Sequence, residues 1–209
     1  MQHSPLIAIV DVDVATRAAW PPLDLARAYM DGGARLLQVR AKQVASAPFL
    51  ELCEAVVASA RPYDASVIIN DRVDVARLSG AAGVHLGQED LPATAARQQL
   101  GAQSIVGLST HTVEQIEDAR REPISYVAVG PIFGTATKDT GYDAVGLELV
   151  KQAVARVGAG LPVVAIGGIT LERVRLVTDA GATSVAVISD LLTGGSPMKR
   201  VQQYLRALG

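Results

Sequence analysis

Short apolar runs recur along the chain, separated by longer segments in which hydrophobic and polar residues follow a helical period. The runs are almost continuously apolar, which favours strands buried on both faces and therefore a parallel sheet covered by helices. They lie at residues 6–11, 35–40, 66–70, 83–86, 104–108, 125–130, 162–167 and 184–189. We expect each run to form one strand.

The segments between these runs predict helices. LDLARAYMDGG, LVKQAVARVG and LERVRLVTDAG place apolar residues three and four apart, as on one helix face. At MDGGARLLQV, LSGAAGVHL and TDAGATSVAV, glycine stands between a helix and the next strand, where its tolerance of the left-handed conformation marks a helix stop. Strands and helices alternating over 209 residues predict a single (β/α)8 barrel domain spanning 1–209. The alternative is an open doubly wound sheet.

Composition indicates a globular protein with one sizeable core and gives no sign of nucleic-acid binding or of a membrane span. Hydrophobic residues make up 49% of the chain, and the net charge is −2, so no basic surface for nucleic acid is expected. No apolar run approaches the roughly 18 residues of a membrane span, and MQHSPLIAIV does not resemble a signal peptide. We expect a cytoplasmic protein without a membrane or nucleic-acid partner, with homo-oligomerisation left open. The single cysteine, Cys53, is expected to be a buried hydrophobe.

Polar residues, or in one case a pair of glycines, lie at the ends of most of the predicted strands. In a parallel barrel the carboxyl ends of the strands form the face that carries the active site, so these residues are candidates for it. In strand order they are Gln38, Arg40 and Lys42, then Asn70 and Asp71, then His85, Gln88 and Asp90, then Ser109 and His111, then Thr135, Thr137 and Lys138, then Gly167 and Gly168, and finally Ser189.

Two aspartates at neighbouring strand ends are candidates for a metal site. Asp71 and Asp90 offer the hard oxygen ligands that suit Mg²⁺, which usually takes one or two carboxylates together with water and substrate phosphate. The alternative is that each aspartate caps the helix that follows it.

Basic and glycine-containing segments predict two anion sites. Arg40 and Lys42, with Gln38, point to one side of an extended segment, and the loop GTATK adds hydroxyls and an ammonium group. Solvated loops or ion pairs to carboxylates are the alternatives. The second site would combine Gly167 and Gly168 with Ser189, because phosphate sites in barrels commonly lie after strands seven and eight; Ser189 could instead only cap a helix. Two phosphorylated substrates would fill these sites.

Seven ordered motifs resemble those of the thiamine-phosphate synthase family. They are LLQVRAK, IINDRVDVA, GVHLGQEDLP, VGLSTHT, YVAVGPIFGTATKDT, VVAIGGIT and GATSVAVIS, and the likeness spans nearly the whole chain. The resemblance implies a magnesium-dependent transferase. It would join hydroxymethylpyrimidine pyrophosphate to hydroxyethylthiazole phosphate through a dissociative step, releasing thiamine phosphate and pyrophosphate.

The resemblance also implies roles for individual residues. Asp71 and Asp90 would hold Mg²⁺, and Gln38 would meet the pyrimidine. The pyrophosphate contacts would be Arg40, Lys42, Asn70, Ser109 and Lys138, of which Arg40, Ser109 and Lys138 are the catalytic candidates. The remaining substrate contacts would be Thr135 and Thr137 in the loop, and Gly168, Ile188 and Ser189 at the thiazole-phosphate end.

Two alternatives and some departures from the family remain. A thiazole tautomerase on the same fold would need no metal and would use His111 as an acid or base, and a catalytically silent phosphate binder would have lost the acidic residues. Gly134 stands where the family often has proline, which loosens the loop after the sixth strand. Asp11 and Asp13 are expected to be turn or capping residues, and His85 to be packed or hydrogen-bonded.

Overall fold

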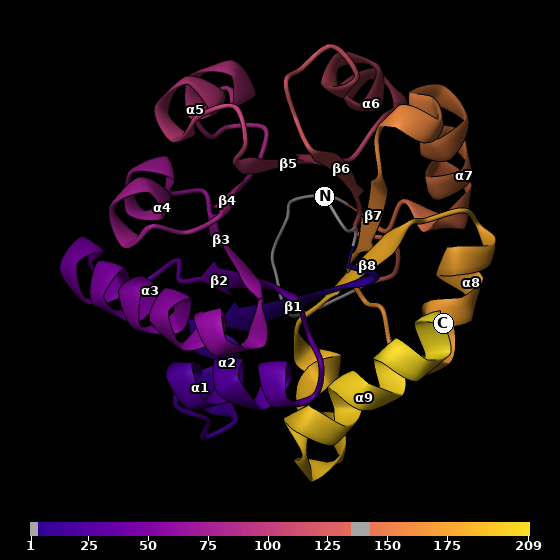
Figure 1. The fold of residues 1–209 in the computed structure, drawn as a ribbon. Coiled ribbons are helices and arrows are strands. Elements are labelled where there is room, and N and C mark those ends of the chain that lie inside the picture. The colour runs from indigo at the N-terminus through magenta and orange to yellow at the C-terminus, as the bar shows by residue number, and fades with distance from the viewer. Residues whose placement is uncertain (1–3, 135–142) are drawn as a thin grey trace.

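The computed structural model describes residues 4–134 and 143–209. Its strands form a closed parallel barrel in which each strand pairs with the next and β8 closes on β1 (Figure 1). The strands are β1 (Leu6–Asp11), β2 (Leu36–Arg40), β3 (Ser66–Asn70), β4 (Gly83–Leu86), β5 (Ile105–Thr110), β6 (Tyr126–Val129), β7 (Val163–Ile166) and β8 (Ser184–Val187). The predicted barrel is confirmed, and the open doubly wound sheet is excluded.

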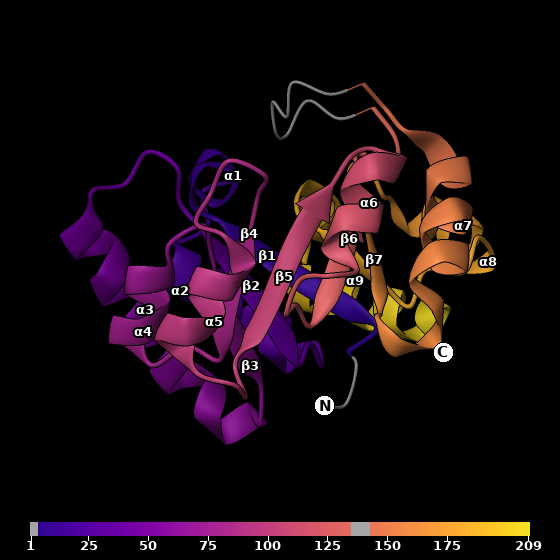
Figure 2. The same cartoon turned by 90° about the horizontal axis from the view of Figure 1, so that it is seen from above.

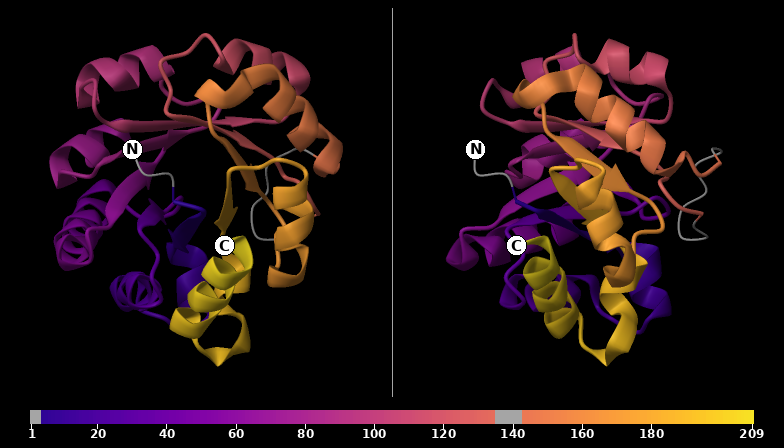
Figure 3. Two further views of the ribbon diagram at one scale, coloured as in Figure 1. Left: turned by 45° about the vertical axis from the view of Figure 1, so that its right-hand side comes forward. Right: turned by 90° about the vertical axis from the view of Figure 1, so that its right-hand side faces the viewer.

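Helices surround the barrel. The α-helices are α1 (Val12–Arg17), α2 (Pro22–Asp31), α3 (Ser46–Ala60), α4 (Val73–Ser79), α5 (Ala93–Leu100), α6 (Val113–Ala119), α7 (Gly146–Val157), α8 (Val174–Asp179) and α9 (Pro197–Leu208). Short 3₁₀ helices are η1 (Arg61–Tyr63), η2 (Gly158–Gly160), η3 (Leu171–Arg173) and η4 (Ser189–Gly195). The last helix, α9, packs against α2 and α8 and so covers the closure between the first and last strands (Figure 3).

The glycines predicted to end helices have the expected backbone. Gly33 has φ 101°, Gly80 has φ 69° and Gly181 has φ 99°, and each follows a helix and precedes a strand. A side chain in this left-handed region is strained, which explains the choice of glycine.

Alternation along the strands separates an inner core from an outer one. Inward positions carry Ile7, Ile9, Ile68 and Tyr126, which fill the barrel, whereas their strand neighbours pack outward against the helices. The same inward face continues to the carboxyl ends of the strands as Asp11, Gln38, Arg40, Asn70 and Ser109, all of them buried. Figure 2 shows the arrows of the strands pointing to one end, so these polar groups gather on a single face.

The outer layer holds the single cysteine. Cys53 lies on α3 with 0% exposure, as predicted, and burial raises the pKa of its thiol to about 12. Across residues 4–134 and 143–209, no helix is long and apolar enough to cross a membrane.

Candidate active site

Asp71 begins the loop after β3 and reaches toward β4. Its φ of 63° is an uncommon conformation that aspartate tolerates better than most residues, and such strain is concentrated at functional sites. The backbone N–H of Asp71 donates to the carbonyl of His85 at 2.8 Å, which fixes the turn. The Asp71 carboxylate forms an ion pair with the ammonium group of Lys42, which follows β2. Asp71 thus links the carboxyl ends of β2, β3 and β4 through its carboxylate and its backbone N–H.

Asp90 lies beside Asp71 in the loop after β4. Its carboxylate accepts a hydrogen bond from the backbone N–H of Gly87 at 2.7 Å. Burial raises the pKa of the Asp90 carboxyl, and the neighbouring Asp71 carboxyl raises it further, against the opposing effects of the Gly87 N–H and of Lys42. Asp71, predicted from a separate strand end, is therefore close enough to Asp90 to affect the pKa of the Asp90 carboxyl.

The helix-capping interpretation of the two aspartates is wrong. The N-cap residues of α4 and α5 are Arg72 and Pro92, and neither helix has a side-chain cap hydrogen bond. Within the described part of the chain, no group of three or more His, Cys, Asp or Glu side chains is placed to hold a metal. Asp71 and Asp90 are thus a pair of neighbouring carboxylates and not part of a larger cluster of such residues in the described chain.

Arg40 is held by the carboxylate of Asp11, for which the sequence predicts only a turn or capping role. Asp11 does cap α1, because one of its oxygens accepts the backbone N–H of Val14 at 3.0 Å. Its other oxygen forms an ion pair with the Arg40 guanidinium, and both side chains are nearly buried. The parallel register places Asp11 directly opposite Arg40. The ion-pair alternative for Arg40 and Lys42 is thus present in the structure, and it fixes both groups at the barrel mouth.

A chain of hydrogen bonds inside the barrel runs from Tyr126 on β6 through His85 on β4 to Ser109 on β5. His85 accepts or donates at both ring nitrogens, 2.8 Å from the Tyr126 hydroxyl and 2.8 Å from the Ser109 hydroxyl. The Tyr126 ring fits because Gly107 has no side chain: a Cβ there would lie 2.1 Å from Tyr126 Cζ. Burial raises the pKa of Tyr126, so its hydroxyl stays protonated. The prediction that His85 is packed or hydrogen-bonded within the structure is confirmed. Its ring holds the Ser109 hydroxyl in position.

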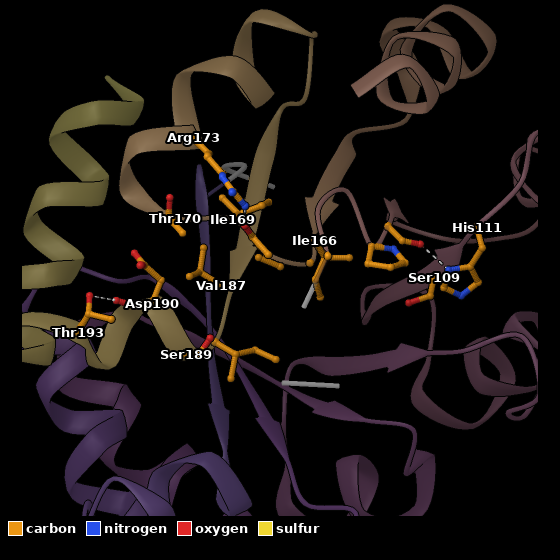
Figure 4. A pocket seen from close by; sticks show the side chains of 17 residues that line it. Ser109, His111, Ile166, Ile169, Thr170, Arg173, Val187, Ser189, Asp190 and Thr193 are labelled. Carbon is orange, nitrogen blue, oxygen red and sulfur yellow. Dashed lines mark hydrogen bonds between the residues drawn. The ribbon is translucent and has the colours of Figure 1, made fainter. Parts of the chain in front are cut away.

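A cavity of about 340 Å³ opens at the carboxyl ends of β5 to β8 (Figure 4). Four of the residues predicted for substrate contact line it together: Ser109, Gly168, Ile188 and Ser189. The predicted acid or base His111 also lines it. Gln38 and Asn70 are buried on the inner strand face outside this lining. The predicted loop residues Thr135, Thr137 and Lys138 lie outside the residues that the structure describes.

The glycine pair after β7 serves packing as well as the pocket. Gly167 and Gly168 have φ values of 98° and 62°. A Cβ on Gly167 would meet Pro131 at 2.6 Å, and one on Gly168 would meet Phe133 at 2.8 Å. The two glycines therefore let the loop after β6 pack closely against the turn after β7.

Sequence reasoning missed the charged residues around this pocket. Arg173 lines it from η3, and Asp190 lines it from η4, where Arg200 contacts the Asp190 carboxylate at 2.8 Å. Tyr204 donates to the same carboxylate at 2.6 Å. Nothing in the local pattern indicates these contacts, because Asp190 and its partners belong to different elements.

The fold and these groups define a class of protein. A closed parallel barrel with carboxylates, basic groups and a pocket on the carboxyl face of its strands is the architecture of a small-molecule barrel enzyme. A pocket after β7 and β8 is the usual phosphate position in this class.

Comparison with known proteins identifies the family. A family model for thiamine monophosphate synthase matches residues 7–191. A thiamine-phosphate synthase of Koribacter versatilis is 41% identical over 207 residues, covering 97% of this chain and 95% of the relative. One from Chlorobium phaeovibrioides is 39% identical over 195 residues, covering 93% and 92%. The structure of a thiamine phosphate pyrophosphorylase from Pyrococcus furiosus matches with a TM-score of 0.86 at 30% identity, covering 97% of this chain and 94% of that one.

The chain belongs to the thiamine monophosphate synthase family, and it is a transferase of thiamine biosynthesis. The resemblance expected from its motifs is confirmed.

Proposed function

We propose that this enzyme joins hydroxymethylpyrimidine pyrophosphate to hydroxyethylthiazole phosphate, in a magnesium-dependent reaction that releases thiamine phosphate and pyrophosphate. The observation that carries this proposal is a cluster of acidic and basic groups together with a pocket, both at the carboxyl ends of the barrel strands. Asp71, Asp90 and Lys42 form the cluster, and Ser109 and Ser189 line the pocket. His85 joins them, since its carbonyl accepts from the Asp71 N–H and its ring contacts Ser109.

The acidic pair fits a magnesium ion. The raised pKa of Asp90 reflects the cost of burying a carboxylate beside Asp71, and a bound divalent cation relieves such a cost. Asp71 and Asp90 would hold the ion, with substrate oxygens and water completing its ligands. The chemistry that the ion supplies is neutralisation of charge on the departing pyrophosphate.

The protein's own groups favour departure of an anion followed by attack of a held nucleophile. Arg40, fixed by Asp11, and Lys42, paired with Asp71, would offer N–H donors where pyrophosphate oxygens would lie. Asn70 and the Ser109 hydroxyl would donate to the same group, and Gln38 would position the pyrimidine. Such preorganised donors lower a barrier without a protein nucleophile.

The thiazole end is assigned to the pocket after β7 and β8. Gly168, Ile188 and Ser189 would hold the thiazole phosphate there, with the nitrogen facing the pyrimidine methylene. Thr135, Thr137 and Lys138 of the loop after β6 are proposed as further contacts to the phosphate groups. They complete the set of basic and hydroxyl groups around the two substrates.

A thiazole tautomerase is the second candidate, and a silent phosphate-binding barrel is the third. His111 lines the pocket and is the acid or base that a tautomerase would need. The adjacent Asp71 and Asp90 carboxylates argue against both alternatives, because a metal-free tautomerase has no use for a pair of cation ligands and two carboxylates do not assist phosphate binding. The relatives from Koribacter versatilis and Chlorobium phaeovibrioides are both thiamine-phosphate synthases.

A direct assay tests the proposal. Purified protein is mixed with both substrates and Mg²⁺, with and without EDTA, and thiamine phosphate is followed through its fluorescent oxidation product. We expect product only when Mg²⁺ is free. Folded protein that forms no product refutes the synthase, and a thiazole-isomerisation assay then distinguishes the tautomerase from the silent binder. Product that persists in EDTA refutes the metal requirement.

A further inference from the structure

The pocket after β7 and β8 has an uneven distribution of charge. Among the described residues that line it, Arg173 is the one arginine or lysine, and Asp190 is the one carboxylate. Figure 4 shows Arg173 with Ile169 and Thr170 on one side of the pocket, far from Ser109 and His111. A cation thus lies at the end of the pocket remote from the chain that links Ser109 to His85.

The negative charge of Asp190 is already compensated. Its carboxylate accepts from Arg200 at 2.8 and 3.1 Å and from the Tyr204 hydroxyl at 2.6 Å. The backbone N–H of Leu171 also donates to it, at 3.2 Å. Arg200 carries the charge that compensates Asp190, and it also lies 3.7 Å from the exposed carboxylate of Glu172. Among the described residues that line the pocket, the charge of Arg173 is therefore not paired with a carboxylate, and its guanidinium favours binding of an anion there.

Arg173 is also held in place. One terminal N–H donates to the carbonyl of Gly168 at 3.1 Å, and the guanidinium lies over the Phe133 ring, 4.7 Å from its centroid. A guanidinium carries five N–H donors, and contacts with the described residues use one of them. The contact with Phe133 and the hydrogen bond to Gly168 restrict the side chain, so less side-chain entropy is lost when its other donors bind a ligand.

We propose that Arg173 is a specificity residue that recognises the phosphate of the thiazole substrate. The ligand class is a monophosphate ester, whose oxygens match the planar fork of a guanidinium. The identity of the ester rests on the proposed function, whereas the anion site itself rests on the charge and the contacts of Arg173.

The test compares Arg173→Met with wild type. Methionine keeps apolar contact with Phe133 but removes the charge. We expect the KM for hydroxyethylthiazole phosphate to rise at least tenfold and the KM for the pyrimidine pyrophosphate to change less than twofold. Arg173→Lys restores the charge without the fork and should recover part of the loss. Arg175→Met is the matched control, because Arg175 is an exposed arginine of α8 outside the pocket lining.

Calorimetry with the thiazole phosphate alone, and separately with inorganic phosphate, gives a readout that does not require turnover. Weaker binding of both in Arg173→Met, with Arg175→Met unchanged, supports the inference. An active wild type whose two KM values are unaltered in Arg173→Met, or rise equally, overturns it. If the wild type binds the phosphates through Arg173 but makes no thiamine phosphate, the anion site is supported and the proposed reaction is refuted.

Discussion

Gly107→Ala should destabilise the barrel by forcing Tyr126 away from His85. The new Cβ would lie 2.1 Å from Cζ and 2.3 Å from the hydroxyl oxygen of Tyr126. Side-chain contacts of this kind are never shorter than about 3 Å, so the ring must move by the order of 1 Å. Tyr126 is only 5% exposed and lies inside the closed barrel, so the surrounding core must move with it.

The magnitude follows from three effects. Overpacking a core costs about 1–3 kcal/mol. Losing the hydrogen bond between Tyr126 and His85 costs about 0.5–1.5 kcal/mol. Alanine restricts the unfolded chain more than glycine does, which returns about 0.4–1 kcal/mol. We therefore expect the free energy of unfolding to fall by about 2 kcal/mol.

Urea unfolding followed by circular dichroism measures the change. Gly160→Ala is the control, because Gly160 has an ordinary φ and a Cβ there would meet nothing within 4 Å. The same Gly107→Ala change made in a Tyr126→Leu background should cost less, because the clashing ring is gone. If the free energy of unfolding of Gly107→Ala lies within about 0.5 kcal/mol of the wild-type value, or if the substitution costs the same in both backgrounds, a clash with Tyr126 is refuted.

Three further predictions follow from buried groups. Asp11→Asn should raise the KM for the pyrimidine pyrophosphate more than the KM for the thiazole phosphate. It should also lower the free energy of unfolding by about 3 kcal/mol, because the buried Arg40 guanidinium loses its charged partner. Steady-state kinetics and urea unfolding measure the two effects, and equal changes in the two KM values count against the prediction. Ser109→Ala should lower kcat by about 100-fold with an unchanged circular dichroism spectrum; wild-type turnover rejects the role. Cys53 should resist iodoacetamide at pH 8 until urea unfolds the chain, because its pKa is about 12; rapid labelling of the native protein contradicts this.

The Cys53 pKa also has a consequence for stability. The thiol of an unfolded chain ionises near pH 8.5, whereas the buried thiol stays protonated until about pH 12. A pKa raised by folding contributes stability in full below the unfolded value and loses it as pH rises through the folded value. The free energy of unfolding should therefore fall between pH 8 and pH 10, and the fall should be smaller in Cys53→Ala than in wild type.

The strand pattern could be predicted because burial on both faces leaves a continuous apolar run in the sequence. The observed β1, β3 and β4 match the expected ranges, and the other strands differ by one or two residues at their ends. Asp71 and Asp90 could be predicted to lie at the same end of the barrel, because the carboxyl ends of parallel strands share one face.

Contacts set by register or by distant helices could not be predicted. Asp11 meets Arg40 across 29 residues, and His85 meets Tyr126 across 41. Each contact depends on which strand lies beside which and in what register, and the local pattern carries no such information. Arg173 was missed for a related reason, because its position over Phe133 depends on how the loop after β6 packs against the turn after β7.

Magnesium-dependent synthase activity is tested most directly by thiamine phosphate formation at rising Mg²⁺ in wild type, Asp71→Asn and Glu89→Gln. Asparagine tolerates the left-handed φ of residue 71, so the barrel should remain folded while a ligand charge is lost. Glu89 is an exposed acid in the same loop as Asp90 and controls for general charge effects. We predict Mg²⁺-dependent product from wild type and Glu89→Gln, and a sharply reduced rate from Asp71→Asn. Full activity of Asp71→Asn, or its unfolding, would contradict the assignment of Asp71 as a magnesium ligand.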